Sequence, residues 1–280
     1  MREVKPRWVQ KKLGLPLGHT DLTHLTNLRF ADDVLLVSRT LPRLQQILHD
    51  IIAAAKSRGL ELHPDKTKII SSVSQRRGRG NASHAQVMDM RIEILYYSSS
   101  AKYLERKISF DACHAAEIEN RIACAWKRFM TLRDELTSKR YSLNKRMKLF
   151  DATVTATMLY GSAAWTLTKE LESKIRRTQR KMLRMMMMRS GRRVVERSEA
   201  GVTLEPWVDW IRRVTHAAEE HMRKLNVRDW LEAHSDAKRQ WYKELHTNSR
   251  DTWAYWSLRW QPEGQRKQAR PRVRWTDGLN

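Results

Sequence analysis

Cysteine and long apolar runs are both scarce in this sequence. Of its 280 residues only Cys113 and Cys124 are cysteines, and their spacing matches no zinc-binding pattern. Two cysteines cannot build a disulfide framework, so they indicate a reducing compartment. No apolar run reaches membrane-spanning length, and no signal-peptide core follows the basic residues 1–6. We therefore expect an intracellular protein with no membrane partner.

Acidic residues are also in short supply. The chain has 54 Lys and Arg against 31 Asp and Glu, which leaves a net charge of +23 and an isoelectric point of about 10.4. Such an excess of one sign repels itself, and a polyanionic partner is the usual reason a chain tolerates it. Hydrophobic residues make up 41%, enough for a core. The composition favours a phosphate-bearing partner over a soluble protein that merely has a basic surface.

The first 72 residues have the pattern of strands around one helix. Residues 25–30 and 34–37 are short apolar runs joined by Ala31-Asp32-Asp33, which predicts a tight β-hairpin. A helix follows, for which Thr40 is the expected N-cap and Gly59 the left-handed residue at the C-terminal end. Further short strands are expected over residues 60–62 and 68–70, separated by a turn at Pro64-Asp65.

From Asp111 onward the apolar residues recur at helical spacing. A first helix, capped by Asp111, is expected to reach Leu136. Two more are predicted over residues 142–160 and 168–189, and a fourth has Pro206 in its first turn. The expected apolar face of this fourth helix consists of Trp207, Trp210, Ile211, Val214 and Leu225.

Two adjacent carboxylates, Asp32 and Asp33, lie between the apolar runs of the predicted hairpin. Like charges this close repel each other, and a divalent cation held by hard oxygen ligands, such as magnesium, removes that penalty. A tight turn interrupts the alternation of strand side chains, so it can present Asp32 to a metal. From the residues alone, the alternative of an ordinary Asp-rich turn stays open.

An ordered series of motifs resembles the reverse transcriptases of LINE-type (non-LTR) retrotransposons. The matching segments are Phe30-Ala31-Asp32-Asp33, similar to Phe/Tyr-x-Asp-Asp; Gly59 to Lys68, similar to Gly-Leu-x-x-Asn-x-x-Lys-Thr-Lys; Ala101 to Leu104; Tyr160-Gly161 with Trp165; Arg180 to Arg184; and Arg270 to Trp275, similar to Arg-Pro-x-x-Arg-Trp. The order in which these segments follow one another is more specific for this family than any single segment. The chain resembles a C-terminal fragment of such an enzyme, from the Asp-Asp box onward.

This resemblance implies an α+β fold in three parts. Residues 1–110 are expected to form a truncated palm, built from the β-hairpin, its helix and short strands. Residues 111–225 are expected to form an all-helical, thumb-like region, and residues 226–280 a basic, tryptophan-containing segment. The implied activity is RNA-directed DNA polymerisation on an RNA template and a DNA primer.

The resemblance also implies roles for individual residues. Asp32 corresponds to a metal ligand in a two-magnesium site for phosphoryl transfer, with Asp33 as its catalytic support. The residues expected near the primer end or the incoming nucleotide are Lys66, Lys68, Tyr103 and Leu104.

Nucleic-acid contact is predicted for a basic helix and a basic tail. Residues 173–197 contain ten Lys and Arg but only one acidic residue, Glu196, whereas a solvated face usually mixes signs. The predicted contacts are Lys174, Arg176, Arg177, Arg180, Lys181, Arg184, Arg192 and Arg193, together with Arg270, Arg272 and Arg274 of the tail.

Two departures from the family pattern limit the expected activity. The family's other essential aspartate lies on a strand upstream of the Asp-Asp box, where only Glu3 and Asp21 are available here. Glu105 stands where the family usually has Gly, which permits a positive φ. We therefore expect catalysis to need a missing upstream part as partner. The alternatives are a non-catalytic basic helical protein that binds nucleic acid and a fragment that does not fold. The basic clusters and the family resemblance favour the nucleus.

Overall fold

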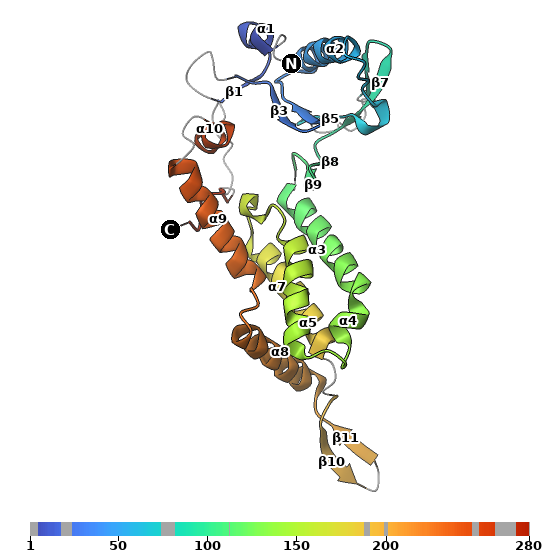
Figure 1. The fold of residues 1–280 in the computed structure, drawn as a ribbon, viewed down its shortest axis with the longest axis vertical. Helices are drawn as coiled ribbons and strands as arrows, with labels where there is room; N and C mark the ends of the chain where they lie inside the picture. Colours follow the sequence, from blue (N-terminus) through green and yellow to red (C-terminus); the bar gives the residue numbers. More distant parts are fainter. Residues whose placement is uncertain are drawn as a thin grey trace. The chain divides into compact units, whose positions relative to one another are not determined.

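The computed structural model describes residues 5–17, 24–73, 82–111, 113–187, 191–198, 201–247, 252–260 and 273–279. The chain divides into two compact units (Figure 1). Unit 1 comprises residues 1–116 and 242–270, and unit 2 comprises residues 117–241 and 271–280. No helix among the described residues has both the length and the apolar content to cross a membrane.

Unit 1 contains the predicted hairpin. Strands β3 (Asn27–Phe30) and β4 (Asp33–Leu36) pair antiparallel, with Phe30 opposite Asp33. Ala31 and Asp32 therefore form a two-residue turn, and Ala31 adopts a left-handed φ of 51°. The prediction of a tight hairpin around Ala31-Asp32-Asp33 is confirmed. A shorter pair, β1 (Leu15–Pro16) with β2 (His24–Leu25), precedes it.

The helix after the hairpin, α2 (Leu41–Lys56), begins and ends as expected. Thr40 is its extended N-cap residue, although its side chain makes no capping hydrogen bond. At the other end Gly59 has φ 71°, and the Leu60 N–H donates to the Ala55 carbonyl at 3.0 Å. This bond and that of Gly59 to Lys56 form a Schellman motif. The helix packs on α1 (Lys5–Gln10), whose Trp8 is fully buried.

A three-stranded sheet completes the first part of unit 1. Strand β7 (Met90–Leu95) is central, with β5 (Lys68–Ile70) parallel on one side and β6 (His84–Val87) antiparallel on the other. The predicted strand at 68–70 is thus confirmed. The predicted strand at residues 60–62 is wrong. The Leu60 N–H donates to the end of α2, and residues 60–62 pair with no strand before the 3₁₀ turn η1 (Pro64–Lys66).

A second hairpin lies at the end of this segment. Strands β8 (Ala101–Tyr103) and β9 (Arg106–Ile108) pair with Tyr103 opposite Arg106. Leu104 and Glu105 form the turn and both have positive φ, 48° and 61°, as in a type I′ turn. Unit 1 also holds the short helix α10 (Trp253–Arg259) and the end of α9 (Trp230–Thr247).

Unit 2 is mainly helical. Its elements are α3 (Cys113–Thr131, from residue 117 on), α4 (Arg133–Thr137), α5 (Leu143–Phe150), the π-helical turn η2 (Asp151–Thr155), α6 (Ala156–Met158), the 3₁₀ turn η3 (Ser162–Ala164), α7 (Lys169–Met187), α8 (Trp207–Lys224) and most of α9. The helix predicted over residues 142–160 is confirmed as α5 to α6, apart from the π turn. The first predicted helix breaks at Leu132, and Trp207 is 61% exposed, so it does not belong to the buried face of α8.

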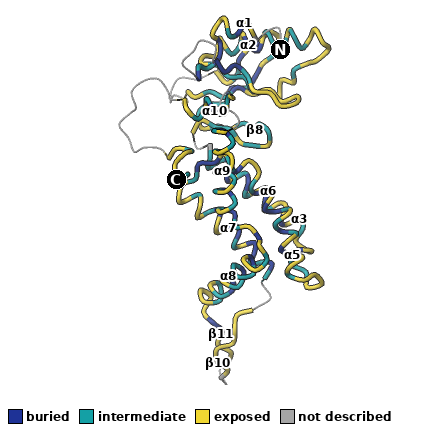
Figure 2. Tube along the Cα trace, turned by 60° about the vertical axis from the view of Figure 1, so that its left-hand side comes forward, coloured by how far each residue is buried: buried dark blue, intermediate teal, exposed yellow. Residues whose placement is uncertain are grey.

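The core of unit 2 is aromatic and sulfur-rich. Phe150 stacks on Trp230 with ring centroids 6.0 Å apart and meets Phe129 edge-on. Met147, Met158, Met182 and Met186 fill the space around them. Figure 2 shows buried positions along these helices. Trp230 comes from the expected C-terminal segment; the three-part division at residues 110 and 225 stays a prediction.

The expectation of an all-helical region over residues 111–225 is wrong in one place. Strands β10 (Val194–Ser198) and β11 (Gly201–Leu204) form an antiparallel hairpin between α7 and α8. Adjacent β-branched residues and Gly201, with φ 135°, favour strand and turn over helix here. The hairpin projects beyond the helices and its strands are exposed (Figures 1 and 2). The mixed α and β composition itself is confirmed.

Candidate functional site

The β3–β4 hairpin presents two carboxylates side by side. Asp32 occupies the turn and Asp33 is the first residue of β4, and both are exposed. Phe30, opposite Asp33, is 66% exposed. The turn breaks the strand alternation at this point, and it places Asp32 at the tip of the hairpin, as the sequence predicts.

Tyr103 of the β8–β9 hairpin lies within electrostatic reach of the Asp33 carboxylate. Burial raises the pKa of the Tyr103 phenol above its ordinary value, and the negative charge of Asp33 raises it further. Leu104 is the first turn residue beyond Tyr103. The charge of Asp33 therefore acts on the Tyr103 phenol, although the two residues are 70 positions apart in sequence.

The turn of the second hairpin has the conformation that glycine prefers. Glu105 is at φ 61°, and its carboxylate forms an ion pair with Lys102 at 2.7 Å. Both side chains are well over half exposed, so the pair contributes little to stability. Glu105 thus adopts a backbone conformation that is disfavoured for a residue with a side chain.

The two lysines predicted near the nucleotide differ in their surroundings. Lys66 is exposed in η1. Lys68, at the start of β5, is ion-paired with Glu93 of β7, and this hydrogen bond is the main reason that the pKa of Glu93 is lowered. The Lys68 ammonium therefore links β5 to β7, whereas the Lys66 ammonium faces solvent.

The carboxylates fit a magnesium site only in part. Asp32 and Asp33 supply hard oxygen donors of the kind that magnesium prefers. Within the described ranges of the chain, no three His, Cys, Asp or Glu side chains gather into a metal-binding group. A two-ion site needs more carboxylates than this pair. The described donor set therefore does not complete the expected two-magnesium centre.

On one flank of α7, predicted basic residues contact α3. The Lys174 ammonium lies 2.7 Å from a carboxylate oxygen of Glu119. The Lys181 ammonium lies over the Trp126 ring, 5.5 Å from its centroid. These cations therefore help to hold α7 against α3.

On the other flank, predicted basic residues contact α8. Arg180 donates from Nε to Glu219 at 2.6 Å, and Arg184 donates from Nη1 to the Thr215 hydroxyl at 3.0 Å. Burial lowers the pKa of Arg184, and the charge of Arg180 lowers it further. Arg176 and Arg177 are exposed, as are Lys169 and Lys181 of the same helix. Contact of α7 with nucleic acid stays a prediction, and most of its cations already have partners within the chain.

The base of the β10–β11 hairpin is fixed by one carboxylate. Glu205 accepts hydrogen bonds from Arg213 Nη2 at 2.8 Å and from the Arg193 N–H at 2.9 Å. The bond from Arg213 and then that from Arg193 lower the pKa of Glu205 to about 2. Arg192 donates to the Glu205 carbonyl at 2.6 Å. The predicted residues Arg192 and Arg193 thus anchor the hairpin.

The C-terminal motif folds back onto the middle of unit 2. The Trp275 indole donates to the Ala163 carbonyl at 2.8 Å, and the Lys238 ammonium lies 5.5 Å from the Trp275 ring centroid. Arg274 is exposed, and its backbone N–H donates to Asp277 at 2.7 Å. Arg270 and Arg272 lie outside the described residues. The motifs around Trp165 and Trp275 are therefore neighbours in space.

A further cationic cluster, which was not among the predicted contacts, lies at the turn between α4 and α5. Residues 139–148 contain five Lys and Arg, a tyrosine and no acidic residue. An aromatic residue within a run of one charge sign was the signal that identifies it.

Comparisons with known proteins bear on the first part of the chain and on most of its length. Residues 4–107 match the family model described as reverse transcriptase (RNA-dependent DNA polymerase). A transposon-derived protein of Caenorhabditis elegans is 28% identical over 264 residues, covering 91% of this chain and 84% of that protein. No solved structure matches significantly. The chain thus contains a segment similar to reverse transcriptases and is similar over most of its length to a transposon-derived protein.

Proposed function

We propose that this chain carries the catalytic Asp-Asp hairpin and the thumb-like helices of a LINE-type retrotransposon reverse transcriptase. The observation that carries this proposal is the position of Asp32 in the two-residue turn of an antiparallel hairpin, inside the segment that matches reverse transcriptases. The activity of the complete enzyme is RNA-directed DNA polymerisation. Asp32 and Asp33 are its catalytic residues here, and Asp32 is the magnesium ligand.

In this proposal the chain alone is catalytically incomplete. Two features support this: the described donor set lacks a third carboxylate, and Leu28, Phe30 and Val34 of the hairpin are exposed. Exposed apolar strand residues beside the site favour a further polypeptide segment packed against them. That segment is the partner that supplies the other aspartate.

The remaining proposed roles concern nucleic acid. Tyr103 and Leu104 lie beside the primer end, because Tyr103 is close enough for the Asp33 charge to affect it. Lys66 is the better candidate of the two lysines for the incoming triphosphate, since it is exposed whereas Lys68 is paired with Glu93. RNA template and DNA primer are the partners, and the nucleus is the proposed location.

Metal binding tests the Asp-Asp hairpin directly. Manganese binding to the purified chain, followed by electron paramagnetic resonance, should be lost in Asp32→Asn and retained in Asp89→Asn. Asp89 is a matched control because it is also exposed, in the turn between β6 and β7. Equal binding by both variants and the wild type would remove the metal-ligand role from Asp32.

Primer extension tests the proposed incompleteness. With poly(A), oligo(dT), thymidine triphosphate and magnesium, the chain alone should not extend the primer. Adding a polypeptide that supplies the upstream strands should restore extension, and Asp32→Asn should abolish it again. Extension by the chain alone would show that its own residues complete the site.

A second candidate function is nucleic-acid binding without catalysis. It is favoured by the net charge of +23 and by the exposed cations outside the Asp-Asp hairpin. Such binding should weaken steeply with salt and be unchanged by Asp32→Asn. If the chain binds nucleic acid in this way and binds no manganese, the second function replaces the first.

A further inference from the structure

The turn between α4 and α5 combines an exposed aromatic ring with unpaired cations. Tyr141 is 48% exposed. The cations around it, all exposed, are Lys139, Arg140, Lys145 and Lys148. In the part of the chain that the structure describes, these four have no ion-pair partner. They differ in this from Lys174 and Arg180 of α7, whose charges are already neutralised by glutamates.

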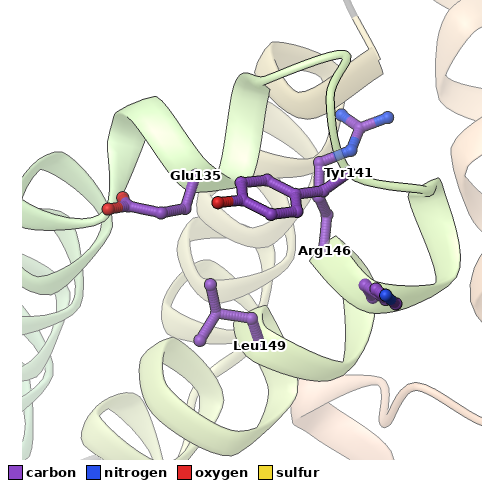
Figure 3. A pocket seen from close by; sticks show the side chains of 5 residues that line it. Glu135, Tyr141, Arg146 and Leu149 are labelled. Carbon is purple, nitrogen blue, oxygen red and sulfur yellow. The ribbon is translucent and has the colours of Figure 1, made fainter.

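A pocket of about 130 Å³ opens beside the ring. It is lined by Glu135, Tyr141, Lys145, Arg146 and Leu149. Figure 3 shows the Tyr141 ring across the pocket with Leu149 beneath it, and the Glu135 carboxylate turned away from it. An aromatic face with an aliphatic floor suits a flat apolar group, and the cations at its rim suit an anion attached to that group.

The turn is held in place from both sides. Arg146 donates from Nη1 to the carbonyls of Leu136 at 3.2 Å and Met186 at 2.8 Å, which ties α5 to α4 and to the end of α7. Ser142 caps α5 by accepting from the Lys145 N–H at 3.4 Å. Tyr141 therefore sits on a preorganised support, which lowers the entropic cost of ligand binding.

We propose that this turn binds single-stranded nucleic acid, with one base stacked on Tyr141 and the adjacent phosphates contacted by Lys139, Arg140 and Lys145. A single strand is favoured over a duplex because only unpaired bases have a free face to offer an exposed ring. The proposal deepens the proposed contact with nucleic acid and rests on it, but it requires no metal at Asp32.

Binding of labelled oligonucleotides tests this site in the full chain. The probes are oligo(dT) and oligo(U) of about 20 nucleotides and a DNA duplex of the same length, measured by fluorescence anisotropy at one salt concentration. Tyr141→Ala should weaken binding of both single strands roughly tenfold and leave the duplex nearly unchanged, because one stacked base is lost. Tyr141→Phe retains the ring and should bind as the wild type does. If Tyr141→Ala weakens the binding of only one of the two single strands, that result identifies whether RNA or DNA is bound at this turn.

Two control variants separate this site from others. Tyr160 is similarly exposed, at 50%, and lies away from the pocket lining, so Tyr160→Ala should leave single-strand binding unchanged. The double variant of Arg176 and Arg177 to Ala tests two exposed cations of α7. Thermal melts of each variant confirm that the fold is kept.

Two outcomes would overturn the proposal. One is unchanged single-strand binding in Tyr141→Ala, and the other is an equal loss on duplex and single strand. Neither outcome depends on Asp32, so failure here leaves the manganese and primer-extension tests of the polymerase site standing. Conversely, a chain that binds no manganese still shows the Tyr141 effect if this site is correct.

Discussion

The indole N–H of Trp230 donates a hydrogen bond to the hydroxyl of Thr155, at 2.9 Å in the interior of unit 2. Both residues are fully buried. Thr155 ends the π-helical turn and Trp230 begins α9, so the bond joins elements that are 75 residues apart. Without the hydroxyl, the indole N–H would lose its acceptor at a site that is closed to solvent.

Thr155→Val should therefore destabilise the chain although it conserves shape. Leaving a buried donor unsatisfied costs about 1–3 kcal/mol. Urea unfolding measures the loss. Thr157→Val is the matched control, since its hydroxyl bonds only within its own helix, to the Thr153 carbonyl at 2.8 Å, and is not fully buried. Equal stability of the two variants would contradict the assignment.

Replacing Glu105 by glycine should stabilise unit 1. A residue with a side chain at φ 61° is strained, and glycine relieves that strain at some cost in chain entropy. The expected gain is about 0.5–1 kcal/mol in the free energy of unfolding. Glu105→Ala also removes the exposed ion pair to Lys102 but keeps the strain, so it should bring no gain. A gain from alanine as large as from glycine would attribute the effect to charge instead.

The Glu205–Arg213 contact should make stability depend on pH in acid. The pKa of Glu205 is lowered from 4.5 to about 2 in the folded chain. Its contribution is therefore complete above about 4.5 and is lost as the pH falls through about 2. Thermal melts across this window should show a steeper loss in the wild type than in Glu205→Gln. Parallel curves would mean that the carboxylate is not bound by Arg213 in solution.

Trp275→Ala should release the C-terminal motif from unit 2. The change removes the hydrogen bond to the Ala163 carbonyl and the contact with the Lys238 ammonium. Together these are worth about 1–2 kcal/mol. Limited proteolysis after the arginines of the tail should become faster. Val273→Ala, at a site 49% exposed, should change neither stability nor cleavage.

The correctly predicted parts of the fold depend on neighbouring residues. The turn at Ala31-Asp32, the left-handed Gly59 and the start of a helix at Ser142 each involve groups a few positions apart. Turn and cap chemistry is local, so the sequence alone carries it. The strands over residues 84–95 were missed, and one of them is completed by parallel pairing with β5, which the local pattern does not encode.

The candidate site was only partly accessible from the sequence. The turn position of Asp32 followed from the apolar flanks, and its connection with Tyr103 came only from the family resemblance. The count of ten cations against Glu196 overlooked Glu119 and Glu219, because these partners of α7 lie 55 and 39 residues from Lys174 and Arg180. Counting charges within one stretch of the sequence cannot detect ion pairs between segments that are distant in sequence.

The central place of β7 in its sheet has a kinetic consequence. β7 pairs with β6 across a short turn, whereas its pairing with β5 spans a longer loop. Loop closure is cheaper for the short connection, so we expect the β6–β7 ribbon to assemble first and β5 to dock afterwards. A substitution that reduces the packing of Ile92, in β7, should then slow refolding. A substitution that reduces the packing of Ile69, in β5, should mainly hasten unfolding.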